Sequence, residues 1–171
     1  MDLFEAIAKR ASVRNFSPRP LTAAEWDRLL RAAMAAPSAV NRQPWDFVVI
    51  EDRATLRRLA DALPYAKMTA EAGGAVLVCG SPARAWGASR DFAVIDATLA
   101  AENLLLAATA LGLGAVWTAV YPEPDREAAV RDILGVPTDV IPLALVPVGV
   151  PAGPVQAKEK FRPELVHRGT W

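Results

Sequence analysis

The chain has 171 residues, the size of one domain, and its 53% hydrophobic and 22% charged residues exclude an intrinsically disordered protein. Nineteen basic residues balance nineteen acidic ones, so we expect no nucleic-acid partner. A single cysteine, Cys79, excludes an internal disulfide and suits a reducing cytoplasm, where we expect the protein to be located.

The first half of the chain alternates between helices and strands. Thr22 and Glu25 form a capping box before a helix with regularly spaced apolar residues that ends at Pro37. The predicted elements are a short helix over residues 2–9, this second helix, a strand over 47–50, a helix over 54–63, a short helix and a buried strand over 75–79. Cys79 is a small buried residue of the last strand, which we favour, or a reactive thiol.

The longest predicted helix covers residues 91–111 and ends at Gly112. Its part from Leu104 to Leu111 has no charged face and must be buried on all sides, which indicates a subunit interface. The uncharged stretch 103–122 is either a membrane span or, as we favour, a buried helix and a buried strand separated by Gly112 and Gly114. The N-terminus lacks a signal-peptide hydrophobic region, and we expect no membrane partner.

The last elements are a strand over 115–121, a helix over 125–134 and a strand over 140–150. Pro142 and Pro147 lack an N–H group, so the last strand should be irregular or lie at a sheet edge. Four strands among helices predict an α+β sandwich in one domain, residues 1–171. The segment from about 151 to 171, rich in proline and lysine, either extends into solvent or wraps a neighbouring subunit.

The usual catalytic constellations are missing from this sequence. His167 is the only histidine, and the chain has no metal-binding spacing, no phosphate-binding P-loop motif and no complete dinucleotide-binding glycine motif. We expect no catalytic side chain and no metal site. If the protein is an enzyme, a cofactor must carry the difficult step.

Three polar clusters are candidate ligand-binding segments. Residues 10–14 combine two guanidinium groups and a hydroxyl, which can bind a phosphate and a polyol or can simply end a helix. Residues 37–45 form a loop between two prolines that can contact a planar heterocycle or be a capped turn. Residues 158–163 are a solvated basic segment or complete a phosphate site with Arg10 and Arg14.

Together these segments resemble the FMN-dependent nitroreductase family over essentially the whole chain. The matching segments are R-x-S-x-R at 10–14, P-S-x-x-N-x-Q-P-W at 37–45, and the long central helix and glycine turn at 96–114. The segment K-F-R-P at 160–163 is similar to the family's C-terminal K-x-R-x-P phosphate contact. The chain lacks the helical insertion of larger members and is similar to the short, single-domain ones.

The resemblance implies an α+β sandwich with a central, mostly antiparallel sheet flanked by helices. It also implies an obligate homodimer whose tail, about residues 151–171, is exchanged and wraps the partner subunit. The implied activity is an FMN-dependent NAD(P)H oxidoreductase that reduces a small acceptor, such as a nitroaromatic compound or a quinone, by ping-pong hydride transfer through flavin N5. FMN would be tightly bound and NAD(P)H a transient hydride donor. The alternatives are an FMN-binding or storage homodimer without efficient turnover, and a dimerisation domain that has lost its cofactor.

The resemblance also implies roles for individual residues. Those expected to bind FMN are Arg10, Lys160 and Arg162 at the phosphate; Ala11, Ser12 and Arg14 near the ribityl chain and the pyrimidine edge; Pro37, Ser38, Ala39 and Asn41 of the other subunit at the ring; and the backbone of Ala119 and Val120 near N5. Lys67 is near the position where some members place a lysine against the ring. The physiological acceptor, the choice between NADH and NADPH, and the roles of His167 and Arg168 stay open.

Overall fold

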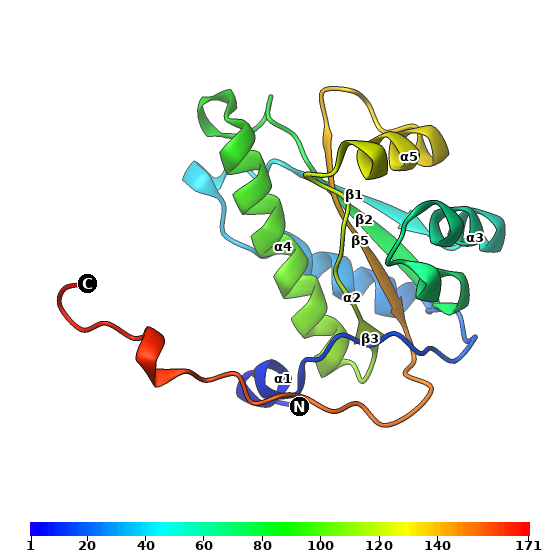
Figure 1. Ribbon diagram of the computed structural model, residues 1–171, viewed down its shortest axis with the longest axis horizontal. Helices are drawn as coiled ribbons and strands as arrows, with labels where there is room; N and C mark the ends of the chain where they lie inside the picture. The colour runs from blue at the N-terminus through cyan, green and yellow to red at the C-terminus, as the bar shows by residue number, and fades with distance from the viewer.

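Helices cover both faces of a five-stranded sheet in the computed structural model, which describes all residues from 1 to 171 (Figure 1). The elements are α1 (Leu3–Lys9), α2 (Ala23–Met34), η1 (Ala39–Asn41), β1 (Trp45–Ile50), α3 (Arg53–Ala62), η2 (Lys67–Glu71), β2 (Gly74–Gly80), η3 (Trp86–Ala88), α4 (Arg90–Ala110), β3 (Gly114–Ala115), β4 (Thr118–Ala119), α5 (Pro124–Leu134), β5 (Ile141–Gly149) and η4 (Pro163–Leu165). The strand order is β1-β2-β5-β3, β4 also pairs with β5, and all these pairings are antiparallel. The predicted α+β sandwich is confirmed.

The strand predicted over 115–121 is divided into two short strands, β3 and β4. The two short strands pair with β5 in the same register, without a shift between them: Ala115 lies opposite Val148 and Thr118 opposite Leu145. Between them the N–H of Val116 donates to the carbonyl of Pro147 at 3.3 Å. Pro147 has no N–H to donate in return, so the pairing is interrupted at this point.

The last strand, β5, is irregular as predicted, but it lies at the centre of the sheet and not at an edge. Its register against β2 shifts between Val78 and Cys79, so that an extra residue, Leu143, bulges between the pairs made by Pro142 and Ala144. The missing N–H groups of Pro142 and Pro147 therefore coincide with the bulge and with the gap between β3 and β4. This coincidence explains how a central strand accommodates two prolines.

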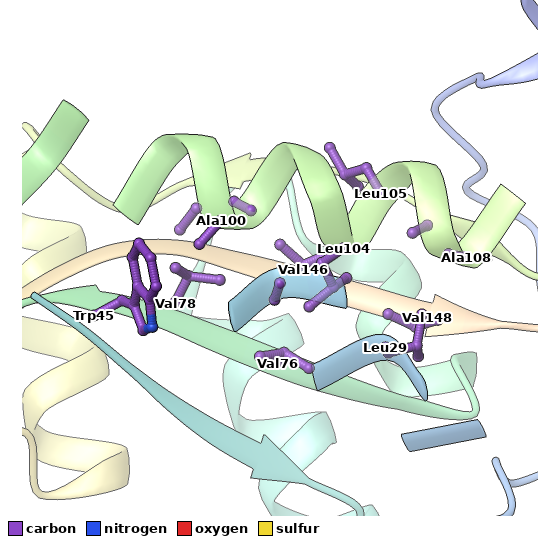
Figure 2. Packing of buried hydrophobic residues seen from close by; sticks show 14 of the residues in the cluster. Leu29, Trp45, Val76, Val78, Ala100, Leu104, Leu105, Ala108, Val146 and Val148 are labelled. Carbon is purple, nitrogen blue, oxygen red and sulfur yellow. The ribbon is translucent and has the colours of Figure 1, made fainter. Parts of the chain in front are cut away.

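Alternating side chains of β2 build two separate cores. Val76 and Val78 point toward α2 and α4, where they pack with Leu29 and Leu104 (Figure 2). Leu77 and its neighbours on the opposite face pack against α3 and α5. The sheet is thus buried on both faces, which explains the almost continuous apolar composition of β2 and β5.

Cys79 is confirmed as a buried strand residue. It is 1% exposed and belongs to the core under α3 and α5. Burial, followed by the nearby charge of Asp46, raises the pKa of the Cys79 thiol to about 12. Because the thiolate is the reactive form, this cysteine is inert at neutral pH.

Helix α4 is long and apolar enough to cross a membrane by length and composition, but it packs on the sheet as a core helix of the sandwich. Within its second half, Leu104, Leu105 and Ala108 are buried by the sheet and the chain's own α1 and α2. The large apolar residues that α4 leaves exposed, Ile95 and Leu99, lie in its first half. In the second half, Leu106 and Ala107 are half-buried and Ala110 is exposed, so the chain alone does not cover this part on all sides.

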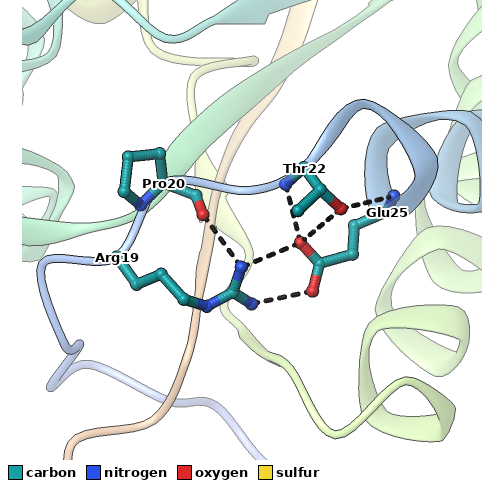
Figure 3. A network of polar contacts seen from close by, with 4 residues as sticks. All are labelled: Arg19, Pro20, Thr22 and Glu25. Carbon is teal, nitrogen blue, oxygen red and sulfur yellow. Dashed lines mark hydrogen bonds and ion pairs between the residues drawn. The ribbon is translucent and has the colours of Figure 1, made fainter.

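The start of α2 is fixed by a polar network around Glu25 (Figure 3). The Glu25 carboxylate accepts hydrogen bonds from the N–H and hydroxyl of Thr22 at 2.7 and 3.0 Å, which confirms the predicted capping box. Both oxygens also accept from the Arg19 guanidinium, at 2.7 and 3.1 Å. The Arg19 bonds first, and the Thr22 backbone bond second, hold the pKa of Glu25 at about 2.

Because the pKa of Glu25 is lower in the folded than in the unfolded chain, its contribution to stability is complete above about pH 4.5 and is lost as the pH falls toward 2. We expect Glu25→Gln to lower the free energy of unfolding by about 1–2 kcal/mol at pH 7, allowing for solvent screening. This difference from the unsubstituted chain should shrink to near zero at pH 2. Urea unfolding of both proteins between pH 2 and 7 measures it, and a difference independent of pH would contradict the assignment.

Candidate functional site

Residues 10–14 lie along the open edge formed by β3. The N–H of Val13 donates to the carbonyl of Ala115 at 3.1 Å, and Ser12 forms a parallel bridge with Ala115. Gly114 permits this approach, because a Cβ atom at that position would lie 2.6 Å from Cγ1 of Val13. The glycine turn after α4 thus brings the N-terminal segment against the sheet.

The pairing also sets the direction of the side chains in this segment. Val13 is buried in a small core with Phe16 and Ala72. In an extended segment, neighbours of a buried residue point the opposite way. Ser12 and Arg14 accordingly face outward and line cavities beside β3.

Three contiguous cavities run along this edge and together form what we call the furrow. The cationic cavity, of about 270 Å³, is lined by Arg10, Ala11, Ser12, Arg14, Gln156, Lys158 and Lys160. The helix cavity, of about 920 Å³, lies between α1, α4 and the tail, and the β4 cavity, of about 560 Å³, lies between β4, η2 and α5. They are contiguous because Arg10, Arg14 and Trp117 each line two of them.

The cationic cavity has four basic residues and no carboxylate in its lining. Glu159, between Lys158 and Lys160, turns back on its own backbone and accepts the N–H groups of Lys160 and Phe161 at 2.8 Å each. These backbone bonds keep the pKa of Glu159 below its usual range. The nearest ion pair is weak, with 3.9 Å between Arg10 Nε and Glu102 Oε1. The cations therefore remain available for an external anion.

The β4 cavity offers a backbone donor. Val116 and Val120 donate their N–H groups to β5, at Pro147 and Leu143. Backbone groups alternate along a strand, so the N–H of Ala119 points away from β5, toward the open edge. Ala119 lines the cavity, together with Lys67 and Arg14.

Val120 occupies a different environment from Ala119. It is fully buried in the core under α3 and α5, and its N–H is engaged by Leu143 at 3.1 Å. Of the two backbone positions named from the sequence, only Ala119 therefore faces the furrow.

The loop at residues 37–41 lies away from the furrow. The N–H of Ala39 donates to both carboxylate oxygens of Asp96, at 3.2 and 3.3 Å, near the start of α4. Within the loop, Val40 and Asn41 have positive φ angles of 51° and 53°, and Ser38 Oγ accepts the N–H of Gln43 at 2.9 Å. Asp96 is 2% exposed, so a buried carboxylate anchors this strained loop.

The structure thus divides the residues named from the sequence into two groups. Those that line the furrow are Arg10, Ala11, Ser12, Arg14, Ala119 and Lys160, with Lys67. Those that do not line it are Pro37, Ser38, Ala39, Asn41, Val120 and Arg162. Trp117 and Arg126 line it without having been named as site residues, because each is unremarkable in its local pattern and only the chain's packing turns it inward. Lys158, which belongs to the basic segment predicted over 158–163, lines it as well.

The sheet edge thus carries a cationic furrow that ends at a free backbone donor, an arrangement suited to an extended anion. The nitroreductase family model matches this chain over residues 7–81 and 63–150. A curated protein of Archaeoglobus fulgidus, provisionally named an NADH dehydrogenase/NAD(P)H nitroreductase, is 36% identical over 99% of both chains. The chain belongs to the nitroreductase family and is an oxidoreductase.

Two further relatives extend this comparison. A crystal structure from Bacteroides thetaiotaomicron, with the same provisional name, is 42% identical, covers 99% of this chain and 98% of its own, and superposes with a TM-score of 0.93. A Bacillus subtilis protein named FMN reductase (NADPH) is 28% identical over 98% of this chain and 73% of its own. The fold described above is therefore that of the family.

Asp96 is expected to contribute to stability by satisfying the N–H of Ala39. We expect Asp96→Ala to lower the free energy of unfolding by about 1–3 kcal/mol, because the N–H loses its acceptor. Asp96→Asn keeps a carbonyl acceptor and should recover most of the loss. Urea unfolding measures both, with Asp91→Ala, at an exposed position of the same helix, as the control. Equal stability of Asp96→Ala and the unsubstituted chain would contradict the role.

Proposed function

We propose that this protein is an FMN-dependent NAD(P)H oxidoreductase that reduces a small acceptor, such as a nitroaromatic compound or a quinone. The observation that carries the proposal is the furrow, in which Arg14 connects a cationic cavity with the free N–H of Ala119. The names of the relatives, which include NAD(P)H nitroreductase and FMN reductase, support it.

The residues of the furrow fit FMN. A phosphate needs several cations and hydrogen-bond donors, which Arg10, Lys158, Lys160 and the Ser12 hydroxyl provide. A polyol chain can follow the edge at Ala11 and Ser12, and a planar ring fits between apolar walls that include Trp117. Arg162, two residues beyond Lys160, would join the phosphate site when the tail packs against a partner.

When bound, FMN would accept a hydride from NAD(P)H at N5 and pass reducing equivalents to the acceptor. Arg14 and Lys67 place positive charge in the β4 cavity, where it stabilises negative charge on the ring. The N–H of Ala119 orients the ring by donating a hydrogen bond. No cysteine, histidine or carboxylate lines the β4 cavity, and the role proposed for its residues is to bind and orient the ring. One open cavity would receive donor and acceptor in turn, which gives ping-pong kinetics.

The site would be completed by a second copy of the chain. Phe4 and Ile7 on α1, and Ile95 and Leu99 on α4, are exposed apolar side chains. Every residue from 152 to 171 is exposed, and the end of the tail extends away from the rest of the chain (Figure 1). A homodimer would cover this face and take up the tail. The loop at residues 37–41 would then contact the flavin ring of the partner subunit. We further propose that the dimer works in the cytoplasm.

The cofactor proposal is tested by colour. We expect the purified protein to be yellow and to release FMN, not FAD, on denaturation. Arg10→Ala should weaken FMN binding about 10- to 100-fold, the loss of one charge-assisted hydrogen bond. Arg28→Ala, at an exposed position of α2, is the control. A colourless protein that takes up no added FMN would refute the proposal.

Anaerobic NAD(P)H then separates an enzyme from a storage protein. Bleaching of the flavin, followed by its reoxidation with a nitroaromatic compound or a quinone, is expected of the enzyme. A holoprotein that NAD(P)H does not bleach would be the FMN-binding homodimer without turnover.

The dimer is tested through the exposed face of α4. We expect Leu99→Glu to produce a monomer in sedimentation velocity and to lower FMN affinity at least about tenfold, because a charge is buried in an apolar contact. Ala54→Glu, at an exposed position of α3, introduces the same charge elsewhere and should change neither. A monomer that binds FMN with unchanged affinity would show that one copy suffices.

A further inference from the structure

The β4 cavity contains one cation, Arg126, that has no role in the proposed cofactor site. Its lining includes three cationic residues, Arg14, Lys67 and Arg126, and no carboxylate. Tyr65 and Trp117 provide aromatic surfaces in the same cavity. The combination of aromatic walls and uncompensated positive charge is suited to a planar anion.

Arg126 is held in place by neutral groups. Its Nη1 donates to the carbonyl of Ala119 at 3.2 Å, and its guanidinium carbon lies 5.6 Å from the centre of the Tyr65 ring. It takes part in none of the six ion pairs of the chain. A guanidinium has five N–H donors, so most of those on Arg126 are free of protein partners. The half-buried charge is therefore oriented but not neutralised.

The position of Arg126 ties it to the reacting edge of the site. It binds the carbonyl of Ala119, the residue whose own N–H faces the furrow. Any anion that binds Arg126 is consequently placed beside the group that would orient the flavin ring.

We propose that Arg126 is a specificity-determining residue that selects small aromatic acceptors bearing a carboxylate. The inference rests on the proposed function, because the acceptor is defined by its place beside the cofactor. The planar fork of a guanidinium matches a carboxylate with two parallel hydrogen bonds, and Lys67 adds a second charge. In an aromatic carboxylate the anion is joined directly to the ring, whereas the phosphates of NAD(P)H are separated from the nicotinamide by a ribose. The compact β4 cavity favours the former.

The test compares two ligands that differ in charge, benzoate and benzamide, which the enzyme does not consume. Their dissociation constants are measured by the change in flavin absorbance of the oxidised holoprotein. We expect benzoate to bind at least about tenfold more tightly than benzamide. Arg126→Met should weaken benzoate about 10- to 100-fold and leave benzamide within about threefold.

Two further variants control for charge and geometry. Arg57→Met, at an exposed position of α3, removes the same charge outside the furrow and should keep the preference for benzoate. Arg126→Lys keeps the charge without the planar fork and should recover part of the preference. The FMN content of each variant is measured separately, so a loss of cofactor is not mistaken for a loss of ligand.

Two outcomes would overturn the inference and leave the proposed function intact. One is equal binding of benzoate and benzamide by a holoprotein that contains FMN, and the other is a preference for benzoate that survives Arg126→Met. A protein without FMN would instead refute the proposed function. Calorimetry with the same ligands would then test whether Arg126 confers carboxylate binding on the chain itself.

Discussion

The hydrogen bond from the N–H of Val13 to the carbonyl of Ala115 is the interaction on which the rest of the site depends. It fixes the N-terminal segment against an open sheet edge, and the burial of Val13 turns Ser12 and Arg14 outward. An exposed strand edge is usually a liability, because its unpaired backbone groups can pair with other chains. Here the edge is partly covered by this segment, and what remains open becomes the furrow.

Pro147 has a second consequence beyond the division of one strand into two. It removes a donor opposite Val116, so between β3 and β4 the edge is held to β5 by the single hydrogen bond from Val116 to the Pro147 carbonyl. The alternation of backbone groups across this edge leaves the Ala119 N–H directed outward. The outward N–H of Ala119 therefore results from the regular alternation within β4, and not from the interruption at Pro147.

Although the net charge of the chain is zero, its basic residues have two different kinds of surroundings. Arg19 binds Glu25, and Arg131 binds Glu127 and the carbonyls of residues 136, 137 and 140, where they stabilise helix ends and a turn. Among the cations of the furrow, Arg10 has only the long contact to Glu102 at 3.9 Å, and Arg14, Lys67, Arg126, Lys158 and Lys160 take part in no ion pair. The cations that stabilise helix ends and those that line the furrow therefore differ in their neighbours and not in their residue type.

The sequence alone determined the helices, the capping box at Thr22 and the segments that resemble the nitroreductase family, because each depends on the spacing of nearby residues. Tertiary structure decided what depends on pairing between distant segments: the central place of β5, the burial of Val120 beside the open Ala119, and the entry of Trp117 and Arg126 into the furrow. Neighbouring residues of a strand point to opposite sides, so a shift of one residue in the pairing reverses the side on which each group lies. The register of the sheet decides this, and the register depends on tertiary structure.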